Sequence, residues 1–166
     1  MLNYAKYSYK NGQTLRQPDT LATINFRDLY AKQYKCAGCI INSDVYQGNG
    51  KHWMALFVDT RSNPATVEFF NSSGNAPAPE WINWMIKTKN EIESVTSKPV
   101  ELCKITNIRH QQSQTECGVY SLFYIYSRLN NLSIEFFKKT PIPDQLMFEY
   151  RQHIFTDKSM PDMKIF

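Results

Sequence analysis

The sequence predicts an α+β domain in which a small mixed sheet packs between helices, and three segments carry this prediction. Residues 53–59 (WMALFVD) form a continuous apolar run, which is typical of a strand buried on both faces. Residues 80–94 carry apolar side chains at helical spacing, which indicates an amphipathic helix. Residues 117–129 form a second, strongly apolar helix directly after a polar loop.

Weaker signals place the other elements. Residues 47–50 (QGNG) are expected to form a turn, and residues 61–64 another, so that the strand at 53–59 pairs antiparallel with the next one. Ser133 and Asp144 are expected as N-caps of two late helices. The remaining predicted elements, in chain order, are a helix around 26–34, strands at 38–43, 66–71 and 100–106, and helices at 134–139 and 145–155.

The chain is expected to form a single core domain over residues 1–166. Its length of 166 residues fits one domain, and 42% of its residues are apolar. Residues 1–35 are polar and rich in tyrosine without a clear period, so most of this segment is expected to wrap the surface.

Charge and composition disfavour several functions. The net charge of +4 is modest and the basic residues are scattered, so no nucleic-acid partner is expected. No apolar run approaches the roughly 18 residues that span a bilayer, and the first residues lack the apolar segment of a signal peptide. We therefore expect no membrane association, a reducing intracellular compartment, and free thiols at all four cysteines.

Two of these cysteines, Cys36 and Cys39, have the spacing of a zinc knuckle. A second pair of cysteine or histidine ligands does not follow at a suitable distance in the sequence. The sequence thus implies neither a metal nor an organic cofactor.

Cys117 is the strongest candidate for chemistry. It is the first residue of an apolar helix, where free backbone N–H groups and the helix dipole stabilise a thiolate. The same amides can stabilise a negatively charged oxygen, and Gly118 leaves room for a substrate. A cysteine at a helix start is, by itself, more often a small buried apolar residue, so further residues must support the assignment.

His52 and Asn71 provide that support. His52 follows a glycine turn at the start of one predicted strand, and Asn71 ends the next. In an antiparallel pair these two ends lie together, so Asn71 can hold the imidazole while its other nitrogen faces a thiol. Taken separately, His52 could be a solvated loop residue and Asn71 an ordinary turn residue.

The ordered segments GKHW (residues 50–53), EFFNS (68–72) and QQSQTECG (111–118) resemble the motifs of the superfamily of SUMO proteases and adenovirus proteases, the adenain/Ulp1-like peptidases. Within it, residues 36–133 closely resemble the polyprotein-processing proteases of African swine fever virus and related large DNA viruses. The resemblance implies that fold, with the catalytic cysteine at the N-terminus of a central helix.

Carried onto this sequence, the resemblance implies a base at His52, an orienting partner at Asn71 and a nucleophile at Cys117. It places the oxyanion donor at Gln111, with Gln112 and Gln114 as rivals, and the substrate channel beneath Trp53. In better-known members the residue that orients the histidine is Asp or Glu. A neutral Asn71 should therefore stabilise an imidazolium less than those carboxylates do.

The resemblance also implies a substrate and a location. The expected substrates are polypeptides, namely capsid or core precursor polyproteins cut after Gly-Gly-X, in the host cytoplasm and the virion. An indole beside the base leaves a narrow slot that glycine fits, although from the residues alone Trp53 could equally belong to the core. Oligomeric state is not indicated. Two alternatives stay open: an isopeptidase that removes a ubiquitin-like modifier, and a catalytically idle binding module.

Overall fold

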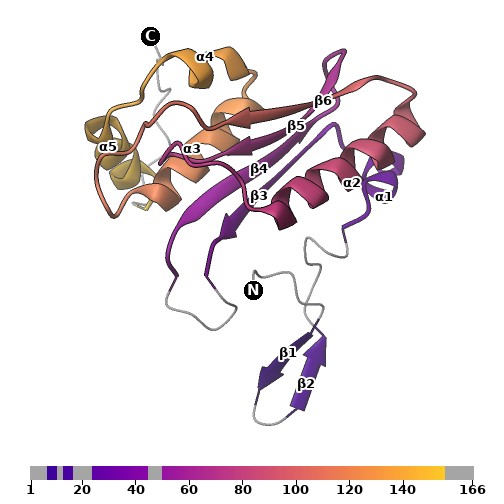
Figure 1. The fold of residues 1–166 in the computed structure, drawn as a ribbon, viewed down its shortest axis with the longest axis horizontal. Coiled ribbons are helices and arrows are strands. Elements are labelled where there is room, and N and C mark those ends of the chain that lie inside the picture. The colour runs from indigo at the N-terminus through magenta and orange to yellow at the C-terminus, as the bar shows by residue number, and fades with distance from the viewer. Residues whose placement is uncertain (1–6, 11–12, 17–23, 45–49, 156–166) are drawn as a thin grey trace.

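The computed structural model describes residues 7–10, 13–16, 24–44 and 50–155. Its main sheet has four strands in the order β3-β4-β5-β6 (Figure 1). The pairs β3/β4 and β4/β5 are antiparallel, whereas β5 and β6 are parallel, so the sheet is mixed as predicted. The strands span Cys36–Asn42 (β3), Trp53–Asp59 (β4), Ala65–Phe70 (β5) and Val100–Ile105 (β6).

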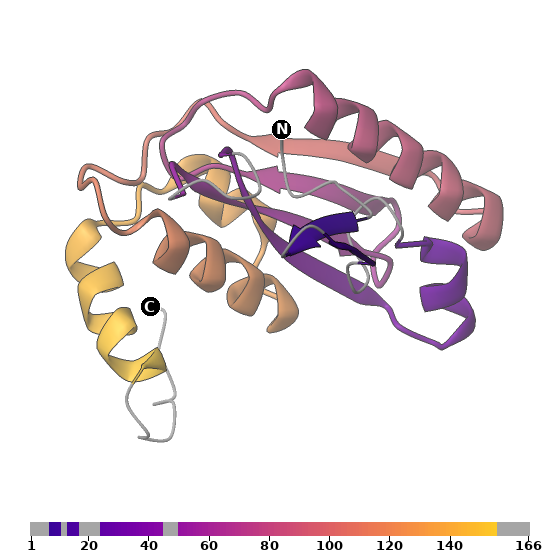
Figure 2. The ribbon, with the colours of Figure 1, turned by 90° about the horizontal axis from the view of Figure 1, so that it is seen from below.

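Helices cover both faces of this sheet, which confirms the predicted α+β arrangement. The long helix α2 connects β5 to β6 and lies on one face, beside the short helix α1, and α3, α4 and α5 lie on the other (Figure 2). The helices span Phe26–Ala31 (α1), Pro79–Thr96 (α2), Cys117–Leu129 (α3), Ile134–Lys139 (α4) and Asp144–Ile154 (α5).

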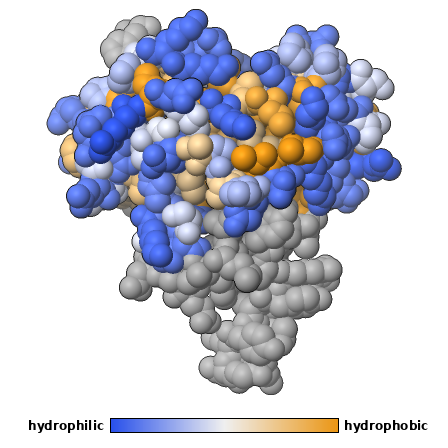
Figure 3. Space-filling model, in the orientation of Figure 1, coloured by the Kyte–Doolittle hydropathy of each residue, from blue (hydrophilic) through white to orange (hydrophobic). Residues whose placement is uncertain are grey.

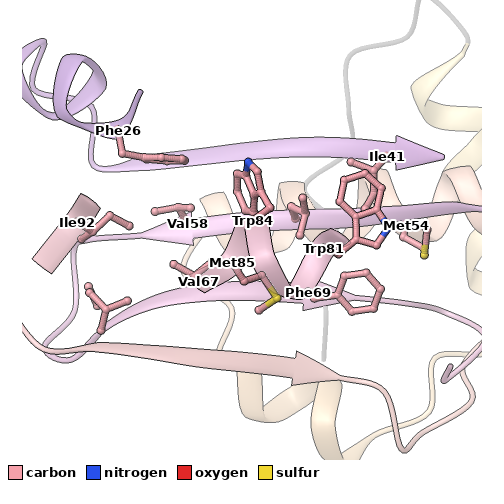
Figure 4. Packing of buried hydrophobic residues seen from close by; sticks show 13 residues of the cluster. Phe26, Ile41, Met54, Val58, Val67, Phe69, Trp81, Trp84, Met85 and Ile92 are labelled. Carbon is pink, nitrogen blue, oxygen red and sulfur yellow. The ribbon is translucent and has the colours of Figure 1, made fainter. Parts of the chain in front are cut away.

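The core facing α2 is built from alternate residues of the strands. Met54 and Val58 of β4 point to this face, where Trp81 and Trp84 of α2 pack on them (Figure 4). All four side chains are buried. Trp81 and Met54 lie close together at the end of this core that is nearest to the start of α2.

The core facing α3 is rich in aromatic rings. Phe70 of β5 stacks on Tyr124 of α3 with ring centroids 4.5 Å apart, and Phe137 of α4 packs edge-on against both. Glu68 is also fully buried on this face, where it accepts hydrogen bonds from the Tyr124 hydroxyl and from Arg128. These contacts fix α3, and therefore its first residue, against the sheet.

Most predicted elements are found within a few residues of their expected bounds, and β4 and α3 agree with them at both ends. Helix α1 ends earlier than predicted, before Gln33, which adopts a left-handed backbone with a φ of 66°. The segments Tyr7–Lys10 (β1) and Gln13–Arg16 (β2) form a separate antiparallel hairpin that the tyrosine-rich pattern did not indicate. Of the predicted turn at residues 47–50, only residue 50 is among the described residues.

The two predicted N-caps have different outcomes. The Ser133 hydroxyl accepts a hydrogen bond from the Glu135 amide, which confirms it as the N-cap of α4. The prediction for Asp144 is wrong, because Pro143 occupies the N-cap of α5 and Asp144 is the first helical residue. Its carboxylate binds backbone amides elsewhere in the fold, as described below.

The face of the molecule that carries α2 is mostly hydrophilic, with hydrophobic side chains gathered mainly over its right half (Figure 3). Within the described parts of the chain, none of the helices is long and apolar enough to cross a bilayer.

Candidate active site

The strand pairing brings His52 and Asn71 together. His52 immediately precedes β4, Asn71 immediately follows β5, and Ala55 of β4 pairs with Phe70 of β5. Nε2 of His52 lies 2.7 Å from Oδ1 of Asn71. The structure therefore has the arrangement that the sequence predicted from the two strand ends.

The hydrogen bonds of Asn71 determine which nitrogen of His52 carries the proton. Asn71 is buried; its Oδ1 also accepts from the amide and the hydroxyl of Ser73, and its Nδ2 donates to the carbonyl of Asn75, 3.0 Å away. Because Oδ1 can only accept, Nε2 of His52 must donate. Nδ1 is then the nitrogen left to face the thiol.

Cys117 is the first residue of α3, and its thiol is hydrogen-bonded to His52. Burial acts to raise the pKa of this thiol, but the hydrogen bonds from His52 and from the backbone of Trp53 and Gly118 outweigh it and lower the pKa below its usual value. The N-cap residue Glu116 provides no side-chain cap and pairs instead with Arg151, 3.0 Å away. The first-turn amides of α3 therefore have no capping side chain.

The pKa of His52 is shifted in the opposite direction, upward. Its hydrogen bond with Cys117 raises the pKa of His52, burial opposes this, and the hydrogen bond with Asn71 raises it further. A lowered thiol pKa beside a raised imidazole pKa favours a thiolate–imidazolium pair, which is the reactive form of a cysteine nucleophile.

Gln111 is buried and bonded to Ser72, the residue after Asn71. Its side-chain oxygen accepts from the Ser72 hydroxyl at 2.8 Å, and its Nε2 donates to the carbonyl of Ser113 at 2.9 Å. One amide hydrogen of Nε2 is left without a partner among the described residues. Gln112 and Gln114 are exposed, so Gln111 is the glutamine whose amide the fold holds in place.

Asp144 fixes the loop that leads to Cys117, a role that the sequence did not reveal. Its carboxylate accepts from the amides of Gln112 at 3.1 Å and Ser113 at 2.7 Å, and from the Tyr120 hydroxyl at 2.8 Å. Asp144 follows Cys117 by many residues on another helix, so no local pattern connects the two. The sequence offered one indirect signal for this role: the polar loop before Cys117 has backbone amides that need hydrogen-bond acceptors.

Trp53 and Gly118 face each other across the entrance to Cys117. A Cβ atom placed on Gly118 would lie 3.7 Å from the indole Cδ1 of Trp53, so the ring covers this glycine at contact distance. Trp53 is 40% exposed, unlike the rest of β4, and so it does not belong to the core.

An open groove of about 460 Å³ has His52 among its lining residues. It runs from His52 and Asn71 to the start of α2, where Glu80 lies on its wall, and Met54 and Trp81 are also among its lining residues.

The other cysteines lie elsewhere. Cys36 and Cys39 are three residues apart on β3 and pack on opposite faces of the sheet, which explains why their spacing does not produce a joint site. Burial and the neighbouring Asp59 carboxylate raise the pKa of Cys36 to about 11, and burial raises that of Cys103 to about 11. In the part of the chain that the structure describes, no three His, Cys, Asp or Glu side chains gather in a way that could hold a metal ion.

A buried cysteine at a helix start, hydrogen-bonded to a histidine that an asparagine holds, defines a papain-like arrangement on an adenain-like fold. The chain belongs to the Ulp1 protease family, because residues 27–163 match the C-terminal catalytic domain of that family. This confirms the resemblance inferred from the three motifs.

Particular relatives are found in large DNA viruses. The protein named SUMO-1 cysteine protease of African swine fever virus is 48% identical over 118 residues, which are 71% of this chain and 43% of that protein. The crystal structure of the selenomethionine form of an African swine fever virus protease superposes with a TM-score of 0.70 at 39% identity, over 92% of this chain and 50% of that one. A protein of Acanthamoeba polyphaga mimivirus is 29% identical over 110 residues, 66% of this chain and 35% of its own length. This chain thus spans half or less of the length of these relatives.

Proposed function

We propose that this protein is a cysteine endopeptidase in which Cys117 is the nucleophile and His52 the general acid and base. The observation that carries the proposal is the hydrogen-bonded series Cys117–His52–Asn71, in which the thiol pKa is lowered and the imidazole pKa raised. A catalytically idle binding module does not require a lowered thiol pKa beside a raised imidazole pKa. These two pKa shifts therefore disfavour that alternative.

The reaction follows from the positions of these groups. The thiolate of Cys117 attacks the carbonyl carbon of the scissile bond, and the carbonyl oxygen becomes an oxyanion. The imidazolium of His52 gives its proton to the leaving amine, which departs and leaves a thioester on Cys117. His52 then takes a proton from water, which attacks the thioester carbonyl and releases the thiolate. The new carboxylic acid loses its proton to solvent, and the imidazolium–thiolate pair is restored.

The oxyanion requires donors that are already in place. The first-turn amides of α3 provide backbone donors beside Cys117, and the remaining amide hydrogen of Gln111 is the best-placed side-chain donor. Asn71 stabilises the imidazolium less than a carboxylate would. It still fixes the ring orientation through a buried amide, whose oxygen also accepts from Ser73 and whose nitrogen donates to Asn75.

Cleavage specificity is assigned to the contact between Trp53 and Gly118. The residues just before the cut are expected to lie against the exposed surface of the indole ring, beside the start of α3, where a side chain would collide with the ring. Glycine has no Cβ atom and lets the backbone lie flat. This supports cleavage after Gly-Gly-X in extended segments, and the expected substrates are viral capsid or core precursor polyproteins in the host cytoplasm and virion.

The decisive experiment is mass-spectrometric mapping of cuts in a peptide library by wild-type protein and by Cys117→Ser. We expect glycine to be enriched in the three positions before the cut, and we expect the variant to be folded but inactive, because an alcohol forms no anion near neutral pH. Full activity of Cys117→Ser would refute the assignment. A library profile without glycine enrichment would leave a peptidase with a different preference.

A second candidate is an isopeptidase that acts on conjugates of a ubiquitin-like modifier. The African swine fever virus relative is named SUMO-1 cysteine protease, which favours this candidate. Both candidates use the same catalytic residues, so only substrates separate them. Incubation with purified SUMO-1 conjugates and, in parallel, with Gly-Gly-X peptides of matched concentration compares the two rates directly.

A further inference from the structure

We propose that the groove beside His52 binds the residues that follow the scissile bond, and that Glu80 makes it select a basic side chain there. This inference rests on the proposed peptidase function and extends it to the other half of the substrate.

The chemistry of the leaving group gives the direction of the substrate. The group that protonates the leaving amine must be within hydrogen-bond reach of it, so the first residue after the cut must begin beside the imidazole of His52. His52 and Asn71 line the near end of the groove, and the lining does not include Cys117, Gly118 or Trp53. We therefore assign the residues before the cut to the Trp53 side and those after the cut to the groove.

The lining of the groove is suited to a peptide. Its apolar part includes Met54 and Trp81, which belong to the rigid core between the sheet and α2. Its polar part includes the side chains of Ser73 and Asn75, which lie in the loop after β5. The first pair is almost fully buried and forms a rigid floor, and an extended chain can form hydrogen bonds with the second pair.

The charge at the far end is negative. Besides His52, Glu80 is the one ionisable side chain among the described residues that line the groove. It is exposed, and its carboxylate has no hydrogen-bond or ion-pair partner in the described parts of the chain. The start of α2 contributes the equivalent of about half a positive charge, so the full charge of Glu80 outweighs it.

Nearby charges do not cancel this effect. The ammonium group of Lys51, the residue before His52, lies 3.8 Å from the Asp44 carboxylate, and neither residue lines the groove. A lysine or arginine side chain of the substrate can therefore pair with Glu80, whereas an aspartate or glutamate is repelled.

The test uses internally quenched peptides that share one Gly-Gly-X sequence before the cut. The three positions after the cut are substituted in turn with Lys, Ala or Glu, and kcat/KM is measured for each peptide. For the best position we expect wild-type protein to prefer Lys over Glu about two- to fivefold, the range that exposed ion pairs provide, and we expect added salt to weaken the preference.

Glu80→Gln should abolish this preference or turn it toward Glu, because the helix dipole then dominates, and Glu80→Lys should reverse it. Asp28→Asn is the matched control: Asp28 is also an exposed acid in the first turn of a helix, but it does not line the groove. The control should keep the wild-type preference.

The two proposals fail in different ways. Cleavage at equal rates for all peptides, or a Lys preference that survives in Glu80→Gln, overturns the role of Glu80 and leaves the peptidase assignment intact. If no peptide is cut, the peptidase assignment fails, and this inference fails with it.

Discussion

Nε2 of His52 lies 2.7 Å from Oδ1 of Asn71, although 19 positions separate the two residues in the chain. The antiparallel pair β4/β5 produces this contact, because it places the residue before one strand beside the residue after the other. Asn71 thereby fixes the protonated nitrogen of the ring and directs the other nitrogen to Cys117.

The Asn71 contact makes a prediction about the pH dependence of activity. The hydrogen bond with Asn71 helps to raise the pKa of His52, so Asn71→Ala should lower that pKa. The imidazolium is then lost at a lower pH, and the alkaline limb of the kcat/KM profile should move to lower pH. Activity should fall about tenfold, less than the loss of about 10²–10⁴ expected for His52→Ala. An alkaline limb that does not move would contradict this role.

The four thiols should differ sharply in reactivity. At pH 7 iodoacetamide should alkylate Cys117 at least about tenfold faster than Cys36 or Cys103, since each unit of pKa changes the thiolate fraction about tenfold. The pKa of Cys117 is lowered, whereas those of Cys36 and Cys103 are raised to about 11. Peptide mapping by mass spectrometry measures the rates.

Cys36 provides an internal control for this experiment, because its side chain is more exposed than that of Cys117. Reaction in the order of exposure would contradict the prediction. In His52→Ala the selectivity for Cys117 should disappear, because the main hydrogen bond that lowers the thiol pKa is removed and its burial remains.

Gln111 and Gln114 can be separated by parallel substitution. Gln111→Ala should reduce kcat on the order of 10²–10³, the usual effect of removing one oxyanion donor. Gln114→Ala should have a much smaller effect, because this side chain is exposed and makes no hydrogen bond within the described residues. Should Gln114→Ala prove the more damaging change, Gln114 is the oxyanion donor and the loop rearranges when substrate binds.

Asp144 should influence turnover without altering the thiol. Asp144→Ala removes the acceptor for the amides of Gln112 and Ser113, so the loop that carries Gln111 loosens and kcat should fall about tenfold or more. The rate of alkylation of Cys117 should stay unchanged, because Asp144 is not among the groups that shift the pKa of that thiol. Asp144→Asn retains one acceptor oxygen, so its kcat should lie between those of the wild-type protein and Asp144→Ala. Equal losses of kcat and alkylation rate would indicate general unfolding of the site.

The buried pair of Glu68 and Arg128 should be important for stability. Arg128→Met leaves the fully buried Glu68 carboxylate without the partner that lies 2.8 Å away, and this should cost about 3–5 kcal/mol in the free energy of unfolding. Denaturant unfolding measures the loss. The double variant Glu68→Met with Arg128→Met should recover much of it, because no unpaired charge remains. A double variant as unstable as the single one would show that the ion pair itself stabilises the fold.

The sequence by itself determined the elements with long and regular patterns. The apolar run of β4 and the apolar helix α3 have the predicted bounds, because a mostly buried element leaves a long apolar pattern with clear ends. It also identified His52, Asn71 and Cys117 as candidates, since each lies at the end of such an element. The hairpin β1/β2 and the end of α1 depend on weak local preferences, and the pattern did not define them.

Only the tertiary structure decided how these residues act on one another. Asp144 is a residue type that favours the N-cap, yet its carboxylate binds the amides of residues 112 and 113, and Pro143 occupies the N-cap position. The burial of Gln111 and the position of Glu80 in the groove likewise depend on segments far apart in the chain. The spacing of residues along a sequence shows which face of a helix or strand each residue occupies. Packing between separate elements decides which partner the residue contacts. Its hydrogen bonds and its pKa follow from that partner.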